Sequence, residues 1–111
     1  MKQAQPPQAA DDTSTELVSI DASFEPLIPK FLSNRKKEVI AMQDALTAQD
    51  FETVQRISHG MKGAGGSYGF DRISEMAAAI EQAAKAGNSS MIEHDLPVLD
   101  AYLGRIKVVY D

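Results

Sequence analysis

The residues best suited to chemistry lie in one short segment, residues 58–69. This segment contains His59, Lys62 and five of the seven glycines of the chain. Neutral imidazole is a good nucleophile, and it is well populated near neutral pH. A lysine one helical turn away can interact with an anionic group at the ring. The segment therefore predicts a nucleophilic histidine with a cation beside it.

The glycines of this segment are unfavourable for the helix that the flanking sequence predicts. Each glycine in a helix interior costs about 1 kcal/mol relative to alanine. A packed domain that accepts several such residues in one place is expected to need close access to its backbone there. Small residues also let two helices pack closely, which we expect of Ala64 and Gly65.

A helical wheel over residues 54–68 predicts where His59 points. At about 100° per residue, a core-facing stripe forms from Val54, Ile57, Met61, Ala64 and Tyr68. His59 lies about 170° from the centre of this stripe, so we expect its ring to be exposed. Five further residues share its side and are candidate site residues: Gln55, Arg56, Lys62, Gly63 and Gly66. The two glycines would leave a clearing through which a second macromolecule approaches the ring.

The run His59-x-x-Lys62-Gly63, followed by small residues and Gly69, resembles the histidine-containing phosphotransfer (HPt) domain of two-component phosphorelays. The resemblance extends from about residue 21 to the C-terminus. It implies a helical bundle that presents the histidine on the outside of one helix.

Residues 80–87, IEQAAKAG, resemble the helix that follows the phosphorylated helix in this family. Some members carry a glutamine there that hydrogen-bonds near the imidazole, at the position that Glu81 occupies in this chain. Either Glu81 or Gln82 would then have this role. On the wheel of this helix Gln82 and Lys85 face away from the core stripe.

The resemblance implies a phosphocarrier without autonomous catalytic activity. His59 would accept a phosphoryl group from a hybrid histidine kinase or a receiver aspartate and pass it to a response-regulator receiver domain, while Lys62 and Arg56 interact with the phosphoryl oxygens. The receiver would supply the aspartate and Mg²⁺, so we expect no cofactor or metal on this chain. The alternative is a docking module that binds a receiver or kinase without being phosphorylated. A ligand-binding bundle is less favoured, because no second strong ligand shares the face of His59.

Length and composition agree with a small soluble domain. At 111 residues the chain is expected to form one domain. It has no cysteine for a disulfide or a thiolate metal site, and its net charge of −5 disfavours binding to nucleic acid or anionic lipid. No apolar run is long enough for a signal peptide or a membrane span. We therefore expect a cytoplasmic monomer.

The periodicity of the chain predicts an all-α fold: an antiparallel four-helix bundle with a short extra N-terminal helical segment. Residues 1–16 read as a disordered tail, and residues 17–111 as the bundle domain. Pro26 and Pro29 should separate a short first segment from a longer helix that begins near Pro29. Asp50 is the expected N-cap of the helix that carries His59, and this helix should end among residues 65–69.

The C-terminal half predicts two further helices. Asp71 is the expected cap of the first, and Gly87 should end it. Residues 90–93, SMIE, form a capping box that should open the last helix. Its apolar seam is expected to continue to the end of the chain through Ile92, Leu96, Leu99, Leu103, Ile106 and Tyr110. No strand-like alternation is predicted.

Two charged features away from His59 have simpler interpretations. A basic cluster is expected on the polar face of the first long helix, where it is either solvated or helps to dock an acidic partner: Lys30, Arg35, Lys36 and Lys37. His94, the second histidine, is expected to be an ordinary surface residue.

Overall fold

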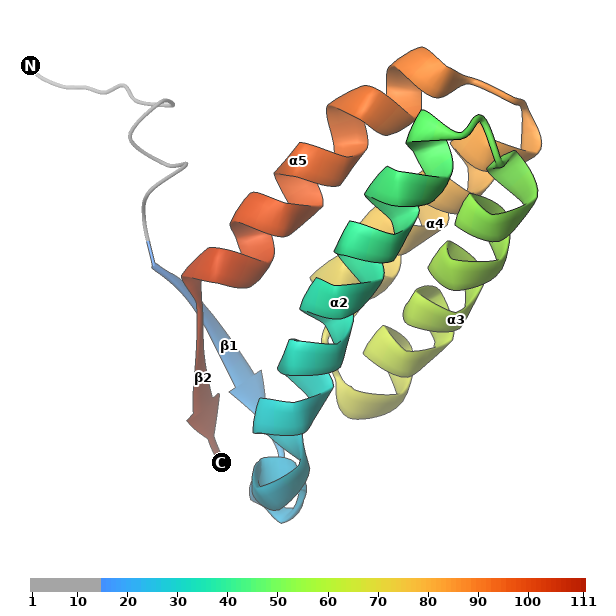
Figure 1. Cartoon of the computed structure of the whole chain (residues 1–111). Helices are drawn as coiled ribbons and strands as arrows, with labels where there is room; N and C mark the ends of the chain where they lie inside the picture. The colour runs from blue at the N-terminus through green and yellow to red at the C-terminus, as the bar shows by residue number, and fades with distance from the viewer. Residues whose placement is uncertain (1–14) are drawn as a thin grey trace, which may run out of the picture.

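The computed structural model describes residues 15–111. Four α-helices form the bundle that the periodicity predicts, preceded by a short 3-10 helix (Figure 1). The elements, in chain order, are β1 (Glu16–Ile20), the 3-10 helix η2 (Ala22–Leu27), α2 (Ile28–Thr47), α3 (Phe51–Tyr68), α4 (Asp71–Lys85), α5 (Ser89–Arg105) and β2 (Ile106–Tyr110). The predicted tail lies outside the described residues except for its last two, and Glu16 begins β1.

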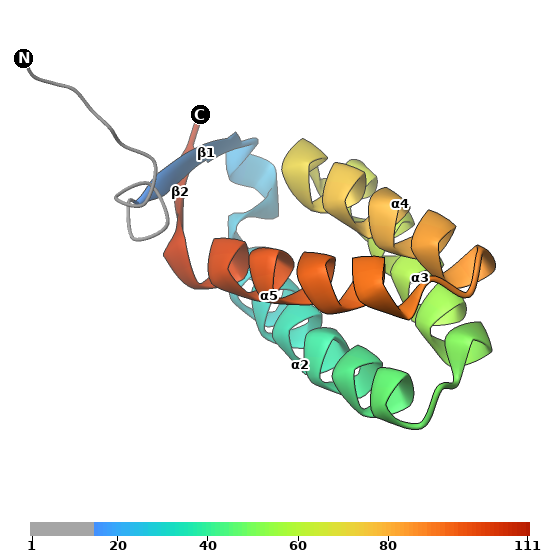
Figure 2. The same ribbon diagram turned by 90° about the horizontal axis from the view of Figure 1, so that it is seen from above.

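The helices form a four-cornered bundle in which short loops join antiparallel neighbours (Figures 1 and 2). Helices α3 and α4 make the most extensive contact of any pair. The centre is filled by apolar side chains from all four helices, among them Val39, Met42, Val54, Met61, Ile73, Ile80, Ile92 and Leu99. Burial of each large aliphatic side chain contributes about 1.5–3 kcal/mol, so this interior holds the helices in fixed register.

Helix α3 begins and ends where its sequence predicts. The side chain of Asp50 accepts hydrogen bonds from the backbone N–H and the hydroxyl of Thr53, at 3.1 and 2.6 Å. At the other end Gly69 adopts a left-handed conformation with φ of 88°, which a side chain would disfavour. The helix that carries His59 is therefore bounded at both ends by local signals.

The starts of α4 and α5 differ from the predictions. Asp71 is the first residue of α4 and not its cap, because the N-cap position is taken by Phe70, whose ring is buried. In α5 the cap is Asn88, whose side chain accepts from the backbone N–H of Met91 at 3.0 Å, so the predicted cap Ser90 already lies inside the helix. Asparagine is at least as good a cap as serine, and it comes first in the chain.

A small parallel sheet joins the two ends of the described chain, and the prediction of no strands was wrong. Strands β1 and β2 pair in register from Glu16 opposite Ile106 to Ile20 opposite Tyr110, at one end of the bundle (Figure 2). Helix α5 ends at Arg105, so Ile106 and Tyr110 do not continue its seam. Ile106 and Tyr110 share one face of a strand, and their spacing of four residues also fits a helical seam over so short a segment.

Candidate functional site

The buried face of helix α3 is rotated slightly toward α4, relative to the face that the wheel predicts. Its fully buried positions are Val54, Ser58, Met61 and Gly65, whereas Ile57, Ala64 and Tyr68 of the predicted stripe are half-buried. Gly65 explains the shift, because a Cβ there would lie 3.0 Å from the backbone nitrogen of Ser74 and 3.1 Å from the carbonyl oxygen of Phe70. The absence of a side chain lets the two helices approach closely.

His59 remains on the outer side of α3, as the wheel predicts. Its side chain is 69% exposed. Gly63, one turn further along, is exposed, and a Cβ built on it would have no atom within 4 Å. Gly66 is also exposed, with only the hydroxyl of Ser74 at 3.8 Å from a built Cβ. The ring therefore stands beside an open stretch of helix backbone.

A buried carboxylate from α4 holds the ring of His59. Oε2 of Glu81 lies 2.9 Å from Nδ1 of His59, and the Glu81 side chain is only 4% exposed. Gln82, the next residue of the same helix, is exposed. Of the two residues that the sequence left open, Glu81 makes the contact.

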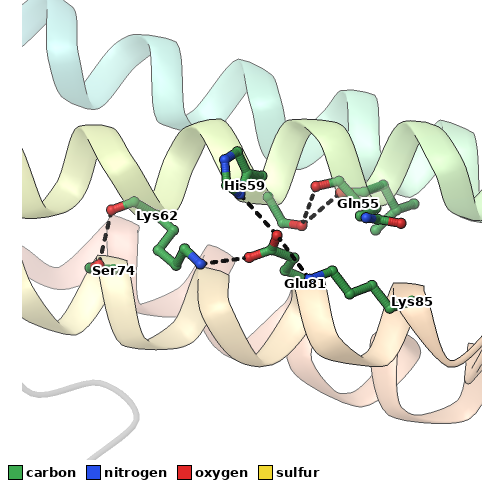
Figure 3. A network of polar contacts seen from close by, with 8 residues as sticks. Gln55, His59, Lys62, Ser74, Glu81 and Lys85 are labelled. Carbon is green, nitrogen blue, oxygen red and sulfur yellow. Dashed lines mark hydrogen bonds and ion pairs between the residues drawn. The ribbon is translucent and has the colours of Figure 1, made fainter.

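Two lysines reach the same carboxylate from opposite sides (Figure 3). Nζ of Lys62 lies 2.9 Å from Oε1 of Glu81, and Nζ of Lys85 lies 3.7 Å from Oε2. The wheel assigned Lys85 to the outward face and missed its place in the site. Its spacing of four residues from Glu81 was the available signal, since such pairs are neighbours on a helix surface.

The charges of this cluster determine which nitrogen of the His59 ring carries the proton. The ammonium of Lys62 lowers the pKa of Glu81 by hydrogen bonding; burial opposes this shift, and the bond from His59 and the charge of Lys85 add to it. An ionised carboxylate can only accept hydrogen bonds, so Nδ1 of His59 is the donor. In the neutral ring the lone pair is then on Nε2, which is the nitrogen available as a nucleophile.

Comparison with known families agrees with this arrangement. The family model of the Hpt domain matches residues 27–108. The chain belongs to the Hpt domain family. Searches of curated proteins and of solved structures returned no match to the chain. Domains of this family serve as histidine phosphocarriers and interact with receiver domains and kinases in phosphorelays.

Hydroxyl groups fix the backbone of the Hpt domain on either side of His59. The hydroxyl of Ser74 in α4 donates to the carbonyl oxygen of Lys62 at 2.9 Å and so ties the two helices together (Figure 3). The buried hydroxyl of Ser58 donates within its own helix to the carbonyl oxygens of Val54 and Gln55, at 2.8 and 3.1 Å. The sequence analysis did not predict these three bonds, because serine is common in such positions without a specific role.

A groove of about 740 Å³ opens beside His59, on the side toward the start of α3. Three of the predicted binding residues line it: Gln55, Arg56 and Glu81. The full lining is Glu52, Thr53, Gln55, Arg56, His59, Glu81 and Lys85. Of the other predicted residues, Lys62 pairs with Glu81, Gly63 and Gly66 lie further along the outer side of α3, and Gln82 faces solvent.

The charged features away from this site differ in outcome. Lys30, Lys36 and Lys37 are exposed as predicted. Arg35 is buried, which corrects the prediction that it joins them. Its guanidinium lies 4.6 Å from the centre of the Phe31 ring, and its Nε pairs with Glu38 at 2.8 Å. The long apolar stem of arginine allows such burial of a charged residue.

Neither a metal cluster nor a membrane span is found within residues 15–111. No group of three or more histidine, cysteine, aspartate or glutamate side chains in this part of the chain is arranged to hold a metal ion. None of the helices described here is long and apolar enough to cross a membrane.

Proposed function

We propose that this Hpt domain carries a phosphoryl group on Nε2 of His59 in a two-component phosphorelay. One observation carries the proposal: a buried, ionised Glu81 accepts the hydrogen bond of Nδ1 while the rest of the ring is exposed. This contact leaves the lone pair on the nitrogen that a partner can reach.

The transfer step needs no base from this chain. Nε2 attacks the phosphorus of an aspartyl phosphate on the receiver, the N–P bond forms, and the P–O bond to the aspartate breaks. The aspartate leaves as a carboxylate. The proton stays on Nδ1, so the phosphorylated ring is positively charged and Glu81 stabilises it. In the reverse direction the same ring leaves as neutral imidazole.

The cations around His59 suit this reaction. Lys62 lies one turn along α3 on the same side and can bind a phosphoryl oxygen, and Arg56 lines the adjoining groove. The chain relies on its partner for the remaining groups. A receiver domain would supply the aspartate and Mg²⁺, and the exposed backbone at Gly63 and Gly66 gives it room to approach.

The alternative, a docking module that is never phosphorylated, leaves the network around Glu81 unexplained. Burial of a carboxylate is energetically unfavourable unless the charge is paired, and a flat docking surface does not require one. Orientation of an exposed nucleophile gives this carboxylate a function.

The proposal is tested by incubating the protein with a receiver whose aspartate carries radioactive phosphate. We expect acid-labile, base-stable label in the wild type and in His94→Gln, and none in His59→Gln. Label that survives in His59→Gln would contradict the assigned site. Absence of label in the wild type with a panel of receivers would favour the docking module.

A further inference from the structure

We propose that Lys85 is the second counter-ion of Glu81, which allows Lys62 to leave the carboxylate and bind the phosphoryl group on His59. This inference rests on the proposed function. Lys85 would be a positioning residue, because it acts through Glu81 and not on the phosphoryl group itself.

The first step of the argument is that Glu81 needs a cation at all times. Its side chain is almost completely buried, and removal of one partner from a buried ion pair leaves a charge that is strongly unfavourable. Oε1 is itself fully buried, and its ion pair is with Lys62. If Lys62 alone neutralised the carboxylate, it could not serve the phosphoryl group without this penalty.

The second step is the placement of the two lysines. Lys62 lies on α3, one turn after His59, and holds Glu81 at 2.9 Å. Lys85 lies on α4, one turn after Glu81, and is at 3.7 Å, within reach of a closer contact. They approach the carboxylate from opposite sides (Figure 3), and both side chains are partly exposed. Either can move without unpacking the core.

The third step follows the charges when the ring is phosphorylated. A doubly negative group on Nε2 attracts Lys62, which stands on the same side of α3. The other charged groups beside the ring are Arg56 and Glu52 of α3, which line the groove. As Lys62 turns to the phosphoryl oxygens, Lys85 closes on Glu81. The carboxylate stays neutralised and continues to hold Nδ1.

The test uses phosphoramidate, a small N-phosphoryl donor that needs no partner protein. Its N–P bond breaks, ammonia leaves with the bonding pair, and the bond from phosphorus to Nε2 forms. The initial rate of His59 phosphorylation is measured by intact mass and ³¹P NMR. Lys107→Met, on the exposed face of β2, is the matched control for loss of one lysine charge.

We expect Lys85→Met to be phosphorylated about two- to fivefold more slowly than Lys107→Met, the size of effect given by a partly exposed ion pair. Lys85→Arg should restore the rate. In a Glu81→Gln background the further change Lys85→Met should have no effect, because there is no carboxylate left to neutralise.

Equal rates for Lys85→Met and Lys107→Met would overturn the inference, and so would a Lys85→Arg variant as slow as Lys85→Met. An effect of Lys85→Met that persists in Glu81→Gln would also contradict it, because Lys85 would then contact the phosphoryl group directly. In all these cases His59 is still labelled, so the proposed function stands. Absence of label in the wild type would instead reject the proposed function.

Discussion

The two histidines of the chain make similar contacts in different surroundings. Nδ1 of His59 is 2.9 Å from Glu81, and Nδ1 of His94 is 3.0 Å from Asp95. Both rings are largely exposed, at 69% and 74%. The carboxylates differ: Glu81 comes from a neighbouring helix, is 4% exposed and is paired with two lysines, whereas Asp95 is the next residue and is 22% exposed. The groups behind the ring, and not its exposure, distinguish a site from a surface residue.

We expect the largest effect when the carboxylate beside each histidine is removed in turn and the phosphorylation rate of His59 is compared. Glu81→Ala should slow phosphorylation of His59 by phosphoramidate about 10- to 150-fold, the range that corresponds to loss of a hydrogen bond to a charged group worth about 1.5–3 kcal/mol. The ring would lose the acceptor that orients it and stabilises its positive charge. Asp95→Ala should leave the rate unchanged. Equal rates in these two variants would mean that Glu81 does not act on the ring.

Two glycines of α3 have different expected roles: one gives a partner access to His59, and the other lets α3 pack against α4. Gly63→Gln should keep the fold, because a side chain there meets no atom within 4 Å. It should slow transfer from a receiver about tenfold, since misplacement of the reacting groups by a small distance is costly, and leave the rate with phosphoramidate unchanged. Transfer from the receiver at the wild-type rate would remove this explanation of the exposed glycine.

The matched control lies two residues further along the same helix. Gly65→Ala should lower the free energy of unfolding by about 1–3 kcal/mol, because its Cβ would press on the backbone of α4. Chemical denaturation followed by circular dichroism measures both variants. Equal stability of Gly63→Gln and Gly65→Ala would contradict the assignment of one glycine to access and the other to packing.

Lys62 is expected to have a smaller effect than Glu81. Lys62→Ala should reduce the rate of phosphoryl acceptance or the lifetime of the phosphohistidine about two- to fivefold, because ion pairs that are partly exposed to solvent contribute little. Rate and lifetime are both measured by loss or gain of the ³¹P signal. If neither changes, Lys62 has no role beyond its contact with Glu81.

The smallest expected effect is on the pH dependence of stability. The pKa of Glu81 is below its ordinary value of 4.5 in the folded protein, chiefly through Lys62. Its contribution to stability is therefore present above that value and is lost as the pH falls through the lowered pKa. Thermal unfolding of wild type and Glu81→Gln between pH 7 and 3 should show the wild type losing more stability on acidification. A constant difference between them would contradict this sign.

Most of the bundle was predictable because its elements carry strong local signals. The caps at Asp50 and Gly69 act on their immediate neighbours, so they can be read from the sequence. The sheet could not be found in this way. Strands β1 and β2 are five residues each and lie about ninety positions apart in the chain, so their pairing is a tertiary property that no local period reveals.

The site was predictable to a similar extent. Residues on the surface of α3 followed from its helical period, and the exposure of His59 is confirmed. The residues that α4 contributes to the site were harder to predict. Hydrophobic periodicity assigns charged residues to solvent, whereas Glu81 is buried. Its position depends on how α3 and α4 pack, which Gly65 determines. Lys85 was missed for the same reason.

The central claim is that Glu81 holds the proton on Nδ1 of His59 and leaves Nε2 free to react. Two-dimensional ¹H–¹⁵N NMR of the histidine rings, recorded before and after phosphorylation by phosphoramidate, tests it most directly. We predict the Nδ1–H form of His59 before the reaction and a phosphorus-coupled Nε2 afterwards. An Nε2–H ring before the reaction, or phosphorus on Nδ1 after it, would contradict the account.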